Sequence, residues 1–557
     1  MTQMLRFANR LFHQKGVALA IILLLAAIGL PLFLVLLKSF FPDDHFDVWA
    51  PLNVILDTDL RGVLFNSLWM GFWVVAGATA LAFPMAFLSV KTSIGQKKWL
   101  DIILIVPFMT PPYIGSMGWI LFMEKRGFLE QMVPAAQAVT PYFFSLFGMV
   151  AIMSLHLFPF LYLILRNALM RIGAGYEEAG AVHGAPFLYR LRRIVLPLLL
   201  GSYAMGALLV FVKTIAEFGT PATFGRKIGY YVLTTEIHRY TSSWPIDFGK
   251  ATALSSVLLT TCLVFWYMQS VITRRFQYQT LGGKGSRAAA RPTSRWRLAL
   301  AWGYVAVLLG LSIGVPYFSI IVASFQKLRG DGLSWDNFTL SHYQTLLGFG
   351  STGLESLLNS LGLALVSATI AVLLGTFLAL KIGSAATRPQ RVVDLFSLLP
   401  NTVPGIVTVV GLILLWNAPW MPIPLYNTYG MVVLTYVVFF LPYSVQYIKS
   451  SLSQIDQTLL QAGRVFGAGS WYTFRRILLP LLVPGILAGW MMTFTISIRE
   501  LVASLMILPP SMQVSATYIF SQFEQGDVSL GMAMAVVSVG LTTIVLAIMN
   551  YINADRK

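Results

Sequence analysis

The sequence predicts an all-α membrane protein with about 12 transmembrane helices in two parallel six-helix repeats. The prediction rests on the composition, on apolar segments that recur along the whole chain, and on a repeated residue pattern. Of the 557 residues, 57% are hydrophobic and only 11% are charged, whereas soluble proteins carry about 25% charged residues. The chain therefore leaves no room for a large soluble domain.

The apolar segments are long enough to cross a bilayer, which requires roughly 20 mostly apolar residues. The predicted spans of the first half are 16–37, 63–90, 99–123, 142–165, 194–217 and 250–273, and those of the second half are 298–325, 357–380, 392–416, 429–448, 477–508 and 529–551. The first apolar stretch exceeds the apolar region of a signal peptide, so we expect it to be retained. Segment 477–508 is too long for one straight span, so part of it should lie outside the bilayer core.

The basic residues predict the orientation. Most of the 39 Lys and Arg residues lie at the two termini or in every second loop, for example in 166–193 and 274–297. The positive-inside rule places these segments in the cytoplasm. We therefore expect a multi-pass membrane protein with both termini cytoplasmic. This distribution also accounts for the net charge of +17 without a nucleic-acid partner.

The two halves of the chain repeat one another. The matching pairs are Asn66-Ser67 with Asn359-Ser360, Pro107 with Pro400, Pro111 with Pro404, Pro159 with Pro442, Gly184 with Gly467, Pro197 with Pro480, and Glu217 with Glu500. The predicted divisions are a first half (1–275), a flexible cytoplasmic linker (276–297) and a second half (298–557). Both halves begin on the same side of the membrane, so a pathway between them is expected. The prolines of the third span, including Pro112, should break or kink it.

A motif follows the fourth span of each half. In the first loop (176–197) and the second loop (459–480), a short helix should end at a glycine, nine residues should follow, and an Ile-x-Leu-Pro segment should open the next span. The motif residues are Glu178, Ala179, Gly180 and Gly184 in the first loop, and Gln461, Ala462, Gly463 and Gly467 in the second. Small residues on one face would allow close contact with a partner.

This pattern resembles the "EAA" signature, E-A-A-x-x-x-G-x(9)-I-x-L-P, of the permeases of ATP-binding-cassette (ABC) importers of type I. The chain is most similar to fused two-half permeases for ferric iron. The resemblance implies that the motif residues dock two separate ATPase subunits, which bind ATP and Mg, and that a periplasmic or extracellular binding protein delivers the substrate. It implies a transport subunit of the bacterial inner membrane that is not an enzyme and holds no cofactor. Glycine replaces the third signature residue in both loops, and Gln461 replaces the glutamate, so the two docking sites should be unequal.

The candidates for the translocation path are Glu217, Arg499 and Glu500, because ionisable groups in or near spans are costly and usually functional. Carboxylates suit a hard cation such as ferric iron, whereas Arg499 would favour an anion. Contact with substrate, an internal ion pair such as Lys213 with Glu217, and a solvated loop end remain open. The resemblance also leaves a phosphonate, a phosphate ester, a polyamine or thiamine as alternative substrates.

The sequence argues against two rival classes of membrane protein. An ion-coupled secondary transporter would not need the repeated loop. A membrane-embedded enzyme is disfavoured because the sequence contains no H-E-x-x-H motif and no convincing catalytic cluster. The single cysteine, Cys262, excludes a Cys-based metal cluster, and the histidines form no cluster in the sequence. No resident metal site is therefore expected.

Overall fold

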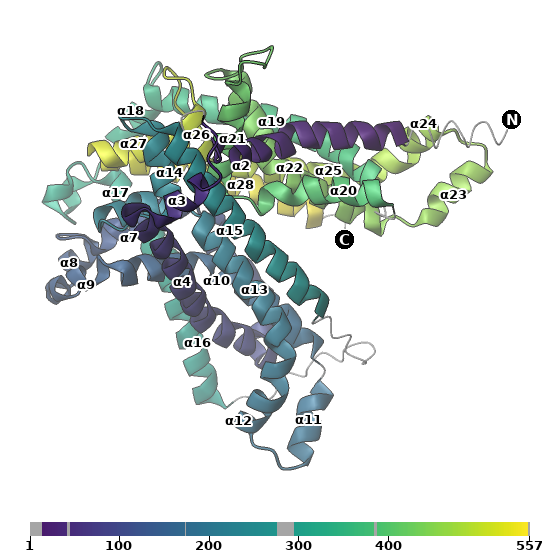
Figure 1. The fold of residues 1–557 in the computed structure, drawn as a ribbon. Coiled ribbons are helices and arrows are strands. Elements are labelled where there is room, and N and C mark those ends of the chain that lie inside the picture. The colour runs from purple at the N-terminus through teal and green to yellow at the C-terminus, as the bar shows by residue number, and fades with distance from the viewer. Residues whose placement is uncertain (1–13, 42–44, 173, 276–293, 384–386, 555–557) are drawn as a thin grey trace. The chain divides into compact units, whose positions relative to one another are not determined.

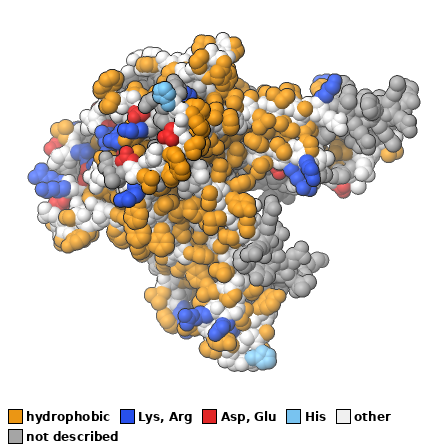
Figure 2. All heavy atoms as spheres, viewed as in Figure 1, with side chains coloured by type: hydrophobic (Ala, Val, Ile, Leu, Met, Phe, Trp, Pro, Cys, Tyr) orange, Lys and Arg blue, Asp and Glu red, His pale blue; other side chains and the backbone are white. Residues whose placement is uncertain are grey.

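The computed structural model describes residues 14–41, 45–172, 174–275, 294–383 and 387–554 (Figure 1). Across these ranges the regular structure is helical, apart from one isolated bridge between Gln326 and Phe338. Ten described helices are long and apolar enough to cross a membrane, or up to 12 if each of two bent helix pairs counts as one span. Figure 2 shows hydrophobic side chains over much of the described surface on this face, with Lys and Arg in small groups toward its edges. The predicted fold class is confirmed.

The helices follow the predicted spans. In chain order they are Gln14–Lys38, which ends in α2 (Leu30–Lys38), α4 (Thr58–Lys91), α10 (Leu146–Arg171), α13 (Leu196–Ala216), α15 (Phe248–Arg275), α16 (Arg295–Leu309) with α17 (Val315–Phe325), α19 (Thr352–Ile382), α22 (Tyr429–Gln454), α25 (Leu479–Ser497) and α28 (Val528–Ala554). Segment 477–508 is interrupted, as predicted: α25 ends at Ser497, and the short helix α26 (Val502–Ile507) follows.

The third span of each repeat is broken. In the first repeat, α5 (Lys98–Ile103) and α6 (Val106–Met109) precede α7 (Pro112–Met123), and the chain bends by 89°. In the second, α20 (Arg388–Leu398) and η10 (Leu399–Asn401) precede α21 (Gly405–Trp416), with a bend of 109°. Pro111 and Pro404 stand at the breaks with ψ of 132° and 133°. Proline donates no backbone hydrogen bond and disfavours helix in the preceding residue, so the predicted break is confirmed.

The chain forms two compact units. Unit 1 contains Met1–Pro51, Tyr240–Ser256 and Leu340–Lys557, and unit 2 contains Leu52–Arg239 and Val257–Thr339. In unit 1, α2 packs on α21 so closely that a Cβ on Gly411 would lie 2.6 Å from the carbonyl oxygen of Pro31. In unit 2, α17 packs on α7, and a Cβ on Gly118 would lie 2.7 Å from the carbonyl oxygen of Pro316. Only glycine permits these approaches.

These units cross the boundaries that the repeat predicts. The first helix of the chain belongs to unit 1, together with the later helices of the second repeat, and helix Arg295–Phe325 belongs to unit 2. The predicted halves, 1–275 and 298–557, are the two copies of the repeated sequence, whereas the units are groups of helices that pack together. The first span of each copy packs in the unit that holds most of the other copy, so the first spans are exchanged. Most of the predicted linker, 276–297, lies outside the described residues.

Candidate coupling loops

Each of the two repeated loops folds as two short helices joined by a tight turn. The first loop contains α11 (Ala174–Val182), α12 (Phe187–Arg190) and the π-turn η5 (Leu191–Val195). The second contains α23 (Gln457–Val465), α24 (Ser470–Thr473) and the π-turn η11 (Phe474–Leu478). In Figure 1, α11 and α12 lie beyond the end of α13. The predicted pair of short helices is therefore present in both loops.

The turn between the short helices requires glycine. Gly184 has φ of +76° and Gly467 has φ of +79°, a region that other residues adopt only with strain. The backbone N–H of Ala185 donates to the carbonyl oxygen of Gly180 at 2.9 Å, and the N–H of Ala468 donates to that of Gly463 at 2.9 Å. These hydrogen bonds are those of a Schellman cap, which ends a helix at a left-handed residue. The predicted role of both glycines in ending the helix is confirmed.

The third signature position is closely packed in both loops. A Cβ on Gly180 would lie 3.1 Å from Cδ1 of Ile194, and one on Gly463 would lie 3.0 Å from Cδ1 of Ile477. Both isoleucines belong to the π-turn that leads into the fifth span. The short helix therefore packs directly on the start of that span in both loops.

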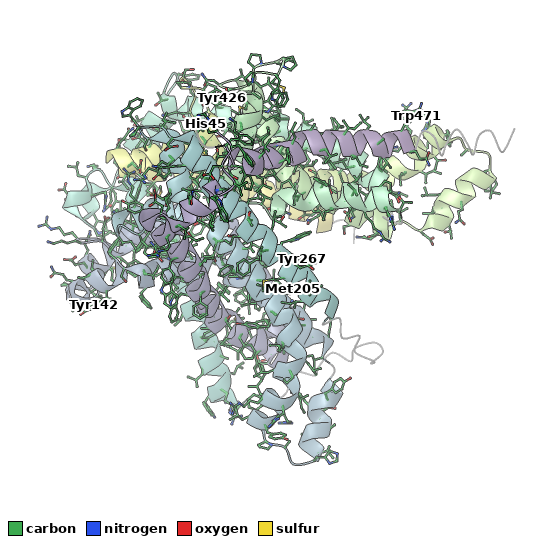
Figure 3. The ribbon with its side chains drawn as sticks, viewed as in Figure 1. His45, Tyr142, Met205, Tyr267, Tyr426 and Trp471 are labelled. Carbon is green, nitrogen blue, oxygen red and sulfur yellow. The ribbon has the colours of Figure 1, made fainter. Side chains whose placement is uncertain are left out.

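The loops expose large apolar side chains. Val182 is 84% exposed, Phe466 is 89% exposed and Trp471 is 70% exposed; Figure 3 labels Trp471 on α24. The signature residues at the first two positions are also exposed, namely Glu178, Ala179, Gln461 and Ala462. Contiguous exposed apolar surface is typical of interaction sites. The arrangement thus offers a small, shaped surface at each loop.

The first loop carries anchors that sequence reasoning missed. Glu177, beside the exposed Glu178, is buried and forms an ion pair with Lys91 at the end of α4. The ring of Phe187 meets that of Phe87 edge-on, with centroids 5.7 Å apart. Adjacent helical positions face different directions, so only one of the two neighbouring glutamates can point at α4. That periodicity was the signal available in the sequence.

Glu217 and Glu500 both cap the segment that follows the fifth span. Glu217 Oε1 accepts the N–H of Gly219 at 2.6 Å, and Oε2 accepts that of Thr220 at 3.0 Å. Glu500 Oε1 accepts the N–H of Ala503 at 3.1 Å, at the start of α26. Capping was not among the alternatives considered from the sequence. Arg499 lies beside Glu500 and is partly buried, and substrate contact by these three residues stays a prediction.

The Asn-Ser pairs of the repeat hold a second helix in place. Ser67 Oγ accepts the N–H of Leu233 at 2.9 Å, and Asn66 Nδ2 donates to the carbonyl of Tyr231 at 3.1 Å. In the second repeat, Ser360 Oγ accepts the N–H of Ser515 at 2.7 Å, and Asn359 Nδ2 donates to the carbonyl of Gln513 at 3.0 Å. These contacts join α4 to the start of α14 (Leu233–Ser242) and α19 to the start of α27 (Ser515–Gln525). Each Asn-Ser pair thus fixes the start of the helix between spans five and six by two hydrogen bonds.

In the described part of the chain, no group of three or more His, Cys, Asp or Glu side chains is placed to hold a metal ion. The single cysteine, Cys262, is buried.

Comparison with known proteins places the repeated loops in a family. Residues 78–278 and 348–557 each match the family described as binding-protein-dependent transport system inner membrane component. The ferric transport system permease protein FbpB of Actinobacillus pleuropneumoniae is 24% identical over 552 residues, which cover 97% of this chain and 78% of that protein. The putative ferric transport system permease protein FbpB 1 of Haemophilus influenzae is 25% identical over 504 residues, covering 89% of this chain and 78% of that protein.

A shorter relative matches part of the chain. The spermidine/putrescine transport system permease protein PotC of Escherichia coli is 28% identical over 242 residues, covering 43% of this chain and 89% of that protein. The two family matches together cover well over half of the chain, and they fall on the two repeats that carry the two loops. This protein belongs to the family of multi-pass inner membrane components of binding-protein-dependent transport systems.

Proposed function

We propose that the chain is the permease subunit of an ABC importer and that each loop docks one ATPase subunit. The observation that carries this proposal is a motif that occurs twice. In each copy, two short helices are joined by a left-handed turn at Gly184 or Gly467, and apolar side chains around the turn are exposed. The ATPases would bind ATP and Mg, and a binding protein would deliver substrate from the opposite side. With the loops cytoplasmic, both chain termini are cytoplasmic as well.

The stoichiometry tests this assignment. Because one polypeptide carries both loops, native mass spectrometry of the purified complex should give one permease chain with two ATPase subunits. A complex that contains two permease chains, or a permease that binds no ATPase, would contradict the proposal.

Ferric iron is the proposed substrate. Relatives named as ferric transport permeases align with nearly the whole chain, and carboxylates such as Glu217 and Glu500 suit a hard cation. Arg499 favours the second candidate, an anionic phosphonate or phosphate ester, because it would attract a negative charge. The likeness to PotC keeps a polyamine among the alternatives, and thiamine also stays open.

Charge-neutralising variants distinguish the two main candidates. Glu217→Gln combined with Glu500→Gln removes both charges and leaves one side-chain oxygen at each position, which can still accept the N–H of Gly219 or of Ala503. The hydrogen bond from Thr220 to the second oxygen of Glu217 is lost. For iron, this double variant should abolish uptake of radiolabelled iron in proteoliposomes, while Arg499→Gln has a milder effect. For an anion, Arg499→Gln should be the severe change. Full iron uptake in the double glutamate variant would remove these carboxylates from the pathway.

A further inference from the structure

An ion pair occurs at the same place in both repeats. Arg166 Nη2 lies 2.8 Å from Oδ2 of Asp101 in unit 2, and Lys449 Nζ lies 2.5 Å from Oδ1 of Asp394 in unit 1. Asp101 and Asp394 have the repeat spacing of Pro107 and Pro400, while Arg166 and Lys449 have that of Pro159 and Pro442. The two repeats therefore both carry opposite charges at these positions, with arginine in the first and lysine in the second.

Each pair joins the broken span to the helix that enters a loop. Asp101 lies on α5 and Asp394 on α20, which are the segments that precede the bends of 89° and 109°. Arg166 and Lys449 lie roughly one and a half turns before the ends of α10 and α22. Those helices lead directly into α11 and α23, the first helices of the two loops.

The pairs are placed to position helices and contribute little to overall stability. Their side chains are 20% and 33% exposed in the first pair and 30% and 26% exposed in the second, and ion pairs that reach water contribute little to folding. The hydroxyl of Tyr162 also donates to Asp101, at 3.1 Å, while valine stands at the matching position, Val445. The shared element is therefore the ion pair alone.

We propose that Asp101–Arg166 and Asp394–Lys449 are positioning pairs. They transmit a movement of each loop to the helix that precedes the break in the third span, which is α5 in the first repeat and α20 in the second. The proposal rests on the proposed function, because it needs an ATPase to move the loops. When an ATPase pulls on α11 or α23, the end of α10 or α22 moves with it, and the ion pair draws α5 or α20 along. The bend at Pro111 or Pro404 is the hinge that this displacement opens or closes.

A distance measurement tests the linkage without depending on which substrate is carried. Spin labels would replace Ile102 on α5, which is 65% exposed, and Met132 beyond α7, which is 48% exposed, in a Cys262→Ala background with the ATPases bound. In the otherwise unchanged chain, vanadate trapping should change the distance between the labels. With Asp101→Asn the change should vanish, and with the charge-reversed pair Asp101→Arg and Arg166→Asp it should return.

Transport measurements give the second readout. Asp101→Asn together with Asp394→Asn should lower the iron transported per ATP hydrolysed by about tenfold in proteoliposomes, while ATPase binding is retained. The matched control is Asp247→Asn, which removes the charge of an exposed pair with Lys250 that belongs to neither loop and to neither broken span.

The outcomes separate the two proposals. An unchanged label movement and normal coupling in the aspartate variants, with ATPases bound, would overturn the linkage and leave the proposed function intact. Loss of ATPase binding in these variants would also overturn it, since the pairs would then support assembly of the complex. If the unmodified chain binds no ATPase, both proposals fail.

Discussion

The two loops share a turn but differ in how they are anchored. In the first loop, Glu177 pairs with Lys91 and Phe187 packs on Phe87, so α11 and α12 are tied to α4. In the second loop, leucine and serine stand at the positions of Glu177 and Phe187, namely Leu460 and Ser470. The second loop has a helix cap instead: Asp456 accepts the N–H of Thr458 at 2.9 Å, and hydrogen bonds from Thr458 lower the pKa of the Asp456 carboxyl.

This contrast separates the features common to both loops from those of the first loop alone. The left-handed glycines and the close contact with Ile194 or Ile477 occur in both loops, so the proposed docking would depend on them. The ion pair and ring contact of the first loop fix its orientation relative to its own bundle. We therefore expect the first loop to transmit force more directly, and the second loop to adjust more on binding.

The largest expected effect comes from removing a turn glycine. Gly184→Val or Gly467→Val forces a β-branched residue into a conformation that costs on the order of 1–3 kcal/mol. Each single variant should lose one ATPase subunit, and the double variant should lose both, by native mass spectrometry. Gly469→Val is the matched control, because a Cβ there would meet open space and its φ is not positive. Two ATPases on the double variant would show that the turns are not needed for docking.

A smaller effect is expected from charge changes on the exposed signature position. Glu178→Lys should reduce substrate-stimulated ATP hydrolysis in proteoliposomes more than Gln461→Lys does, because the first loop alone presents a carboxylate there. Both side chains are exposed, so neither change should disturb the fold. Equal losses from the two substitutions would reject the functional asymmetry of the loops.

The smallest effect should come from the anchor of the first loop. Glu177→Gln removes the charge that pairs with Lys91 while keeping similar size, so α11 should open more readily. Hydrogen exchange of the α11 amides should accelerate several-fold, since local opening sets the exchange rate. The amides of α23 serve as the internal control and should not change. Unaltered exchange in α11 would mean that the ring contact of Phe187 suffices to hold the loop.

The sequence predicted the helices, their breaks and the turns because these depend on local chemistry. Apolar length determines a span, Pro111 and Pro404 interrupt a helix, and Gly184 and Gly467 allow a left-handed turn. Each of these signals can be recognised within one continuous segment of the chain, about 20 residues for a span and only a few for a break or a turn. The predicted orientation of the termini rests on charge distribution and stays a prediction.

The polar contacts were less accessible from sequence because they join distant residues. Asn66 and Ser67 were recognised as repeated, but their partners around Leu233 could be found only in the folded chain. The same holds for Asp101 with Arg166. Glu217 was considered for substrate contact and ion pairing, whereas its carboxylate caps the backbone of its own chain. A repeat identifies equivalent residues and leaves open which copy each of them packs on.

The exchanged first spans have a consequence for biogenesis. The ribosome delivers α2 early, yet the surface of α21 that receives Pro31, at Gly411, is synthesised more than half a chain later. Until then the nascent first helix must be sheltered by lipid or by an insertion chaperone. Two separately translated halves could form these contacts only after they associate in the bilayer. Fusion into one polypeptide makes that association intramolecular.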